Sequence, residues 1–89
     1  MNYAEKLVDF LSNKYFSAID SGKPVSDARA FNGLYQIHEK NLSFIPLDDF
    51  YELVRELERA NLVTVSYGGD QPTSLDLSDS FLNQIQSNQ

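Results

Sequence analysis

The chain has 89 residues, a formal net charge of −6, 42% hydrophobic residues and no cysteine. This length and composition favour one globular domain over residues 1–89 with a modest core, and they exclude a disordered chain, disulfides and thiolate metal sites. No apolar run approaches the roughly 18 residues of a membrane span, and the N-terminus lacks the basic region and apolar core of a signal peptide.

The first predicted element is a long helix that begins after Asn2. Asn2 can cap the helix, with Glu5 three residues later, which approximates a capping box. Hydrophobic residues then recur at three- and four-residue steps over a helix of about 17 residues. They are Leu7, Val8, Leu11, Tyr15 and Ile19, flanked by Phe10 and Phe16. The residues from Ser21 to Pro24 end this helix, because Gly22 accepts a left-handed conformation and proline cannot continue the helix.

A second helix is predicted from a Ser26 cap to about Lys40, after a short edge strand at Val25. Its inward face contains Phe31, Leu34, Tyr35 and His38, with Ala30 and Ile37 next to them. Gly33 is expected inside this helix, where glycine costs up to about 1 kcal/mol relative to alanine and would allow close packing. For His38 we expect a partly buried side chain that is hydrogen-bonded within the fold, not a functional histidine.

The third predicted helix begins near Pro46, a residue that suits a first helical turn. Asp48 and Asp49 follow where negative charge favours the helix dipole. The apolar stripe of this helix consists of Leu47, Phe50, Val54 and Leu57, with Leu53 beside it. Asn61 is expected in the left-handed conformation that ends the helix.

Alternating apolar and polar residues predict two strands after this helix. The apolar positions are Val63, Val65 and Tyr67 in the first strand and Leu75 and Leu77 in the second. The Gly68–Pro72 segment predicts a hairpin loop of about five residues between them. Ser78 and Asp79 then begin a short last helix. This order predicts an α+β winged helix-turn-helix fold, with a three-helix core, a C-terminal β-hairpin wing and a short last helix.

The residue types do not predict an enzyme. One histidine without cysteine excludes the usual nucleophilic triads and zinc sites. Asp48 and Glu52 lie one helical turn apart, but without further ligands they fit a solvated acidic face better than a cation site. Gly68 and Gly69 lack the lysine of a phosphate loop. We therefore expect no catalytic residue, no metal, no cofactor and no small-molecule substrate.

The charge distribution opposes nucleic-acid binding. Residues 46–77 contain seven acidic residues against Arg55 and Arg59, so the third helix and the wing carry a net charge of −5. Because phosphate neutralisation by Lys and Arg supplies most non-specific affinity, an acidic face opposes docking to a duplex. We do not expect the isolated domain to bind DNA. If it does bind DNA, Arg55 and Arg59 are the candidate contacts.

Contact with protein is the other use of such a scaffold. Tyr51, Arg55 and Tyr67 lie away from the predicted stripe or at its margin, and Tyr and Arg concentrate binding energy at interfaces. Val65 and Tyr67 also lie on a wing strand whose open edge can pair with a partner or a second copy. We predict Tyr51, Arg55, Val65 and Tyr67 as partner-binding residues, and a homodimer as the assembly.

Three stretches carry a resemblance to a known family. They are residues 25–27 with the helix that contains residues 34–38, residues 45–57, and the sequence from Leu57 to Val63, with Asn61 where the family has glycine. They resemble the C-terminal winged-helix domain of the origin-recognition and cell-division-cycle initiator family, including its silent-information-regulator paralogue. Members use this domain for DNA contact or subunit contact, and in the paralogue it serves self-association in heterochromatin.

The resemblance implies a non-catalytic, self-associating interaction module of a chromatin or DNA-replication assembly. One alternative is a small DNA-binding transcriptional regulator of the winged-helix type, encoded by a phage or plasmid. A third is an inhibitor that imitates nucleic-acid charge with its acidic helix. For all of them we expect an intracellular protein without membrane contact, nuclear in a eukaryote and otherwise cytoplasmic.

Overall fold

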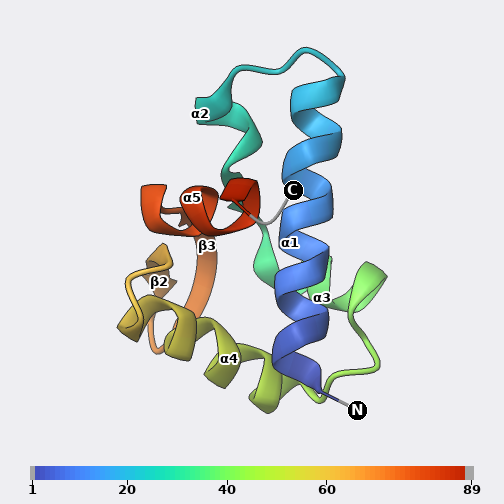
Figure 1. Cartoon of the computed structure of the whole chain (residues 1–89). Coiled ribbons are helices and arrows are strands. Elements are labelled where there is room, and N and C mark those ends of the chain that lie inside the picture. Colours follow the sequence, from blue (N-terminus) through green and yellow to red (C-terminus); the bar gives the residue numbers. More distant parts are fainter. Residues whose placement is uncertain (1, 88–89) are drawn as a thin grey trace.

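Helices surround a small antiparallel sheet in the computed structural model, which describes residues 2–87 (Figure 1). The fold is therefore α+β, as predicted. In chain order the elements are α1 (Tyr3–Asp20), α2 (Val25–Ala28), β1 (Ala30–Asn32), α3 (Leu34–Asn41), α4 (Leu47–Arg59), β2 (Val63–Gly68), β3 (Gln71–Leu77) and α5 (Asp79–Ser87). Within the described residues, no helix is both long and apolar enough to cross a membrane.

The long helix α1 begins and ends as the sequence predicts. The Asn2 side chain accepts a hydrogen bond from the Glu5 backbone N–H at 3.1 Å. Leu7, Leu11 and Tyr15 are buried along one side of α1. At the far end, Gly22 has a φ of +93° and no atom within 4 Å of the position that a Cβ would occupy. The loop of residues 21–24 that follows is exposed.

The predicted helix from Ser26 to Lys40 is wrong. The short helix α2, the strand β1 and the helix α3 replace it, and Val25 begins α2 where an edge strand was expected. Phe31 pairs with Leu75 of β3 and is buried, so pairing with a distant strand overrides the local helical spacing. Gly33, expected inside a helix, has a φ of +69° and immediately precedes α3.

The strand order of the sheet is β1-β3-β2, with both pairs antiparallel. The predicted five-residue hairpin loop is wrong, because β2 and β3 stay paired up to Gly68 and Gln71. A tight turn at Gly69 and Asp70 connects them, and Gly69 supplies a φ of +66°. Pro72 is tolerated in the central strand because β1 pairs only with residues 74–76, so no β1 residue lies opposite it.

The apolar faces of α1, α3, α4 and α5 meet the sheet in one core. Asn61 has a φ of +62° after α4, as predicted. Ser78 caps α5, since its Oγ accepts a hydrogen bond from the Phe81 N–H at 3.2 Å.

His38 is 8% exposed, and its Nε2 lies 2.6 Å from the Ile45 carbonyl, to which it donates a hydrogen bond. The structural role predicted for His38 is therefore confirmed.

Candidate functional site

The predicted partner-binding residues lie around the junction of α4 with the β2–β3 hairpin. Tyr67 is exposed, Val65 is half-buried, and the Arg55 side chain is 31% exposed. Tyr51 is only 5% exposed and packs against Phe50, with 5.7 Å between the ring centroids. Tyr51, predicted away from the apolar stripe or at its margin, therefore belongs to the buried face of α4 together with Phe50 and Val54.

The two arginines of α4 already have acidic or carbonyl partners. The Arg55 Nη2 donates a hydrogen bond to the Asp70 carbonyl at 2.8 Å, and its Nη1 lies 3.9 Å from the Glu52 carboxylate. The Arg59 Nη2 donates to the same Glu52 carboxylate at 2.8 Å. Glu52 therefore partly neutralises both side chains that were predicted as nucleic-acid contacts.

A tyrosine hydroxyl provides a second link between the hairpin and α4. The Tyr67 hydroxyl donates a hydrogen bond to the Glu58 carboxylate at 2.6 Å. This hydrogen bond raises the pKa of Tyr67 above its ordinary value of 10.0, because the carboxylate accepts the proton that ionisation would remove. Together with the bond from Arg55, it fixes the hairpin against α4.

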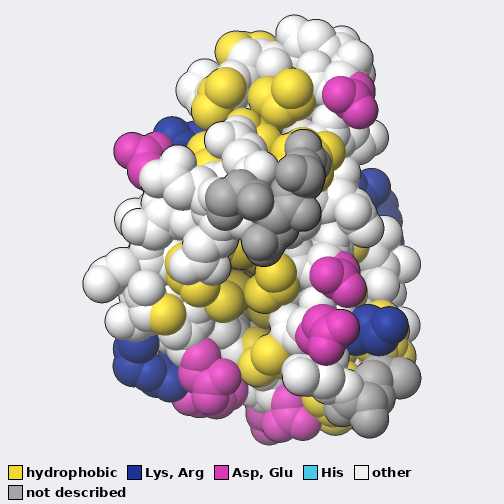
Figure 2. Space-filling model, viewed as in Figure 1, with side chains coloured by type: hydrophobic (Ala, Val, Ile, Leu, Met, Phe, Trp, Pro, Cys, Tyr) yellow, Lys and Arg dark blue, Asp and Glu magenta, His cyan; other side chains and the backbone are white. Residues whose placement is uncertain are grey.

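The outward face of α4 is acidic. Asp48, Asp49, Glu52 and Glu56 are all exposed. In Figure 2, acidic side chains gather at the lower edge of the molecule, where α4 lies. A polyanion that approached this face would meet four carboxylates and two arginines that are already paired.

The strand β2 forms one edge of the sheet, because β3 pairs with it on one side only. The Leu77 N–H donates to the Arg29 carbonyl, so the backbone groups of Leu77 point away from β2. Within an antiparallel pair the direction alternates along each strand. The register Val63↔Leu77 and Val65↔Leu75 then directs the N–H and C=O of Val63 and Val65 outward. These groups lie along the edge of the sheet, where no further strand pairs with β2.

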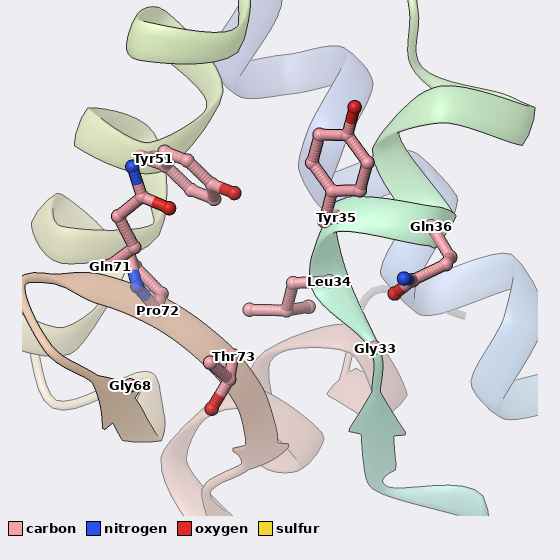
Figure 3. A pocket seen from close by; sticks show the side chains of 9 residues that line it. All are labelled: Gly33, Leu34, Tyr35, Gln36, Tyr51, Gly68, Gln71, Pro72 and Thr73. Atoms are coloured by element: carbon pink, nitrogen blue, oxygen red, sulfur yellow. The ribbon is translucent and has the colours of Figure 1, made fainter.

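A cavity of about 260 Å³ lies between the start of α3, α4 and the hairpin (Figure 3). Its lining residues carry no charged side chain; they include Gly33, Leu34, Tyr35, Tyr51, Gln71 and Pro72. The sequence did not predict this cavity. The one residue that could have indicated it is Gly33, but only if Gly33 had been predicted directly before a helix instead of inside one.

The two tyrosines of this cavity differ in their surroundings. Tyr35 is 46% exposed, and the negative charge of Glu39, together with a hydrogen bond to that carboxylate, raises the pKa of Tyr35. Tyr51 is buried, and Figure 3 shows its hydroxyl pointing into the space in front of Tyr35 and Leu34. The Tyr35 hydroxyl therefore already has an acceptor, whereas the Tyr51 hydroxyl faces the cavity.

A smaller cavity of about 90 Å³ lies between α1 and α4. Ala4, Leu7, Leu53 and Leu57 give it an apolar lining, with Glu56 beside them. Figure 2 shows hydrophobic side chains on this face of the molecule, between α1 and α4. Its small volume and the near absence of polar groups leave few ways to orient a ligand.

Comparison of the chain with protein-family models, curated proteins and solved structures finds no match. Within residues 2–87, no three histidine, aspartate or glutamate side chains come together as a group that could hold a metal ion. The groups available for recognition are therefore the open β2 edge, the acidic face of α4 and the uncharged cavity.

Proposed function

We propose that this chain is a non-catalytic winged-helix module that binds polypeptides and associates with a second copy of itself. The order of two helices, an edge strand, two further helices, a hairpin and a last helix supports the winged-helix assignment. In such a fold α4 takes the position of the recognition helix and the β2–β3 hairpin that of the wing. The resemblance of the sequence to initiator domains is what supports a role of the module in a chromatin or DNA-replication assembly.

The acidic outer face of α4 is the observation that carries this proposal. A duplex-binding helix gains affinity from free Lys and Arg side chains. Here Arg55 and Arg59 share the Glu52 carboxylate, and Asp48, Asp49 and Glu56 lie exposed on the same helix. A polypeptide surface avoids the repulsion that a phosphate backbone would meet there.

Self-association would use the open edge of β2. Two copies that pair their β2 strands in antiparallel orientation would join their sheets through the outward backbone groups of Val63 and Val65. The half-buried Val65 and the exposed Tyr67 would lie at this contact. Backbone pairing of this kind supplies affinity, and the flanking side chains supply selectivity.

Sedimentation velocity over a range of protein concentrations tests this proposal. We expect the mean mass of the wild type to rise toward that of a dimer. Val65→Pro should abolish this rise, because proline removes an outward N–H that the pairing with β3 does not use. Val65→Thr is the matched control: it keeps that N–H and a β-branched side chain, so it should still associate.

Two results would overturn the proposal. The first is a wild type that remains monomeric at every concentration and retains no polypeptide partner. The second is a salt-sensitive complex with duplex DNA that Arg59→Ala weakens, since this would identify the DNA-binding regulator instead. Circular dichroism of each variant verifies that it is folded.

A further inference from the structure

The first turn of α3 lines the cavity and begins with backbone N–H groups that have no acceptor inside the helix. The first N–H groups of a helix find no acceptor within it. Gly33 precedes α3 and offers no side-chain cap to the N–H groups of Leu34, Tyr35 and Gln36, and all four residues line the cavity. The helix dipole adds partial positive charge at this end, which favours an anion.

The Tyr51 hydroxyl is a second, independent donor in the same cavity. Tyr51 is 5% exposed, and its hydroxyl has no hydrogen-bond partner among the residues that the structure describes. No fully buried side-chain oxygen or nitrogen in that part of the chain lacks a partner, so this hydroxyl must reach open space. Figure 3 shows that this space is the cavity.

The remainder of the cavity is uncharged and partly apolar. Leu34 and Pro72 line the cavity but are almost completely buried, so they form apolar wall behind the more exposed lining residues. The start of α3 favours glycine at position 33, because a Cβ at its φ of +69° would be strained and would lie 3.0 Å from the Gln36 Oε1. The cavity therefore combines donors for an anionic oxygen with room for a small hydrocarbon group.

We propose that this cavity binds the C-terminal carboxylate of a polypeptide whose last side chain is small and apolar. Backbone N–H groups of a helix start and a tyrosine hydroxyl are suitable donors for a carboxylate. A ligand with more negative charge, such as a phosphate ester, is disfavoured because no cationic side chain lines the cavity and the chain has a net charge of −6. The inference rests on the proposed function only in that the ligand is a polypeptide.

The test uses N-acetyl-L-leucine as the probe and follows the backbone amide signals by NMR at neutral pH. We expect the signals of Leu34, Tyr35 and Gln36 to shift with saturation as the probe is added. N-acetyl-L-leucine amide, which lacks the negative charge, should cause no such shift. N-acetyl-L-aspartic acid amide carries its carboxylate on the side chain, and inorganic phosphate is a more highly charged anion; both should bind more weakly than N-acetyl-L-leucine.

Tyr51→Phe should weaken binding of N-acetyl-L-leucine about tenfold or more, because it removes one hydrogen bond to a charged group. Tyr3→Phe is the matched control: Tyr3 lies on α1 and is not among the residues that line the cavity, so loss of its hydroxyl should leave the affinity within about twofold. The inference is overturned if acid and amide bind alike, if phosphate or the side-chain carboxylate binds more tightly, or if Tyr51→Phe binds as the wild type does. Sedimentation velocity of the same samples shows whether the chain self-associates, so a failure of this inference can be distinguished from a failure of the proposed function.

Discussion

At the scale of single residues, the position of the hairpin depends on two polar side chains. The bonds from Tyr67 to Glu58 and from Arg55 to the Asp70 carbonyl both cross from one element to another. Their residue types marked Tyr67 and Arg55 as candidate interface residues. Sequence spacing could not reveal their hydrogen-bond partners, because the turn after α4 determines how close the hairpin lies to the helix. The same limit applies to Tyr51, which was predicted away from the apolar stripe or at its margin and is buried in the structure.

Replacing Glu58 by Gln should lower the pKa of Tyr67 toward its ordinary value of 10.0, because the negatively charged acceptor is lost. An NMR titration of the tyrosine ring carbons measures this change. Tyr35 is an internal control, since the raised pKa of that residue depends on Glu39. An unchanged pKa of Tyr67 in Glu58→Gln would show that the bond between the two side chains does not form in solution.

The direction of the pKa shift also fixes its effect on stability. The pKa of Tyr67 is higher in the folded chain than in the unfolded one, so its contribution is fully present below pH 10.0 and is lost as the pH rises through the folded pKa. The free energy of unfolding should therefore fall as the pH rises above 10.0. The fall should be smaller in Tyr67→Phe, which lacks the titrating hydroxyl.

At the scale of elements, residues with positive φ mark where helices begin and end. The sequence identified Asn61 at the end of α4 because Asn tolerates the left-handed conformation. It misplaced Gly33, because the spacing of Phe31, Leu34 and His38 suits one helix as well as a strand followed by a helix. The pairing of β1 with β3, more than forty residues away, decides between them, as Phe31↔Leu75 illustrates.

The hairpin shows the same limit in another form. Glycine and proline between Gly68 and Pro72 predicted an open loop, since both residues interrupt strands. In the structure Pro72 pairs with Tyr67, and a register irregularity lies between Ser66 and Tyr67. Proline fits there because β1 ends before reaching it, which only the full sheet reveals.

Asn61→Ala should lower the free energy of unfolding by about 1 kcal/mol, because alanine in the left-handed region brings its Cβ close to the backbone. Asn61→Gly, which has no Cβ, should remain closer to the wild type. Urea unfolding of the three proteins measures the difference. Equal stability of Asn61→Ala and the wild type would mean that residue 61 leaves the φ of +62° in solution.

At the scale of the whole molecule, charge and topology separate what the sequence can predict from what it cannot. The acidic α4 and the hairpin follow from residue order alone. The cavity does not, because it joins residues 33–36, Tyr51, and Gly68 with residues 71–73 from three parts of the chain. A site built from side chains so far apart in sequence becomes visible only when helix and sheet packing are known.

Raising the salt concentration should strengthen self-association. Each copy has a net charge of −6, so two copies repel one another, and mobile ions screen that repulsion. Duplex binding would weaken as salt is added, because the release of counterions from DNA is less favourable at a high salt concentration. Sedimentation equilibrium at low and high sodium chloride measures whether the dissociation constant of the dimer falls or rises with salt. A dimer that weakens as salt is added would show that attractive ion pairs hold the copies together.

The exposed loop between α1 and α2 offers a practical handle for these measurements. It lies at the end of α1 opposite α4, far from the hairpin (Figure 1). Because the chain contains no cysteine, Lys23→Cys would create a unique thiol there for a fluorophore or a surface anchor. A chain immobilised through residue 23 would present both the cavity and the β2 edge freely to solution.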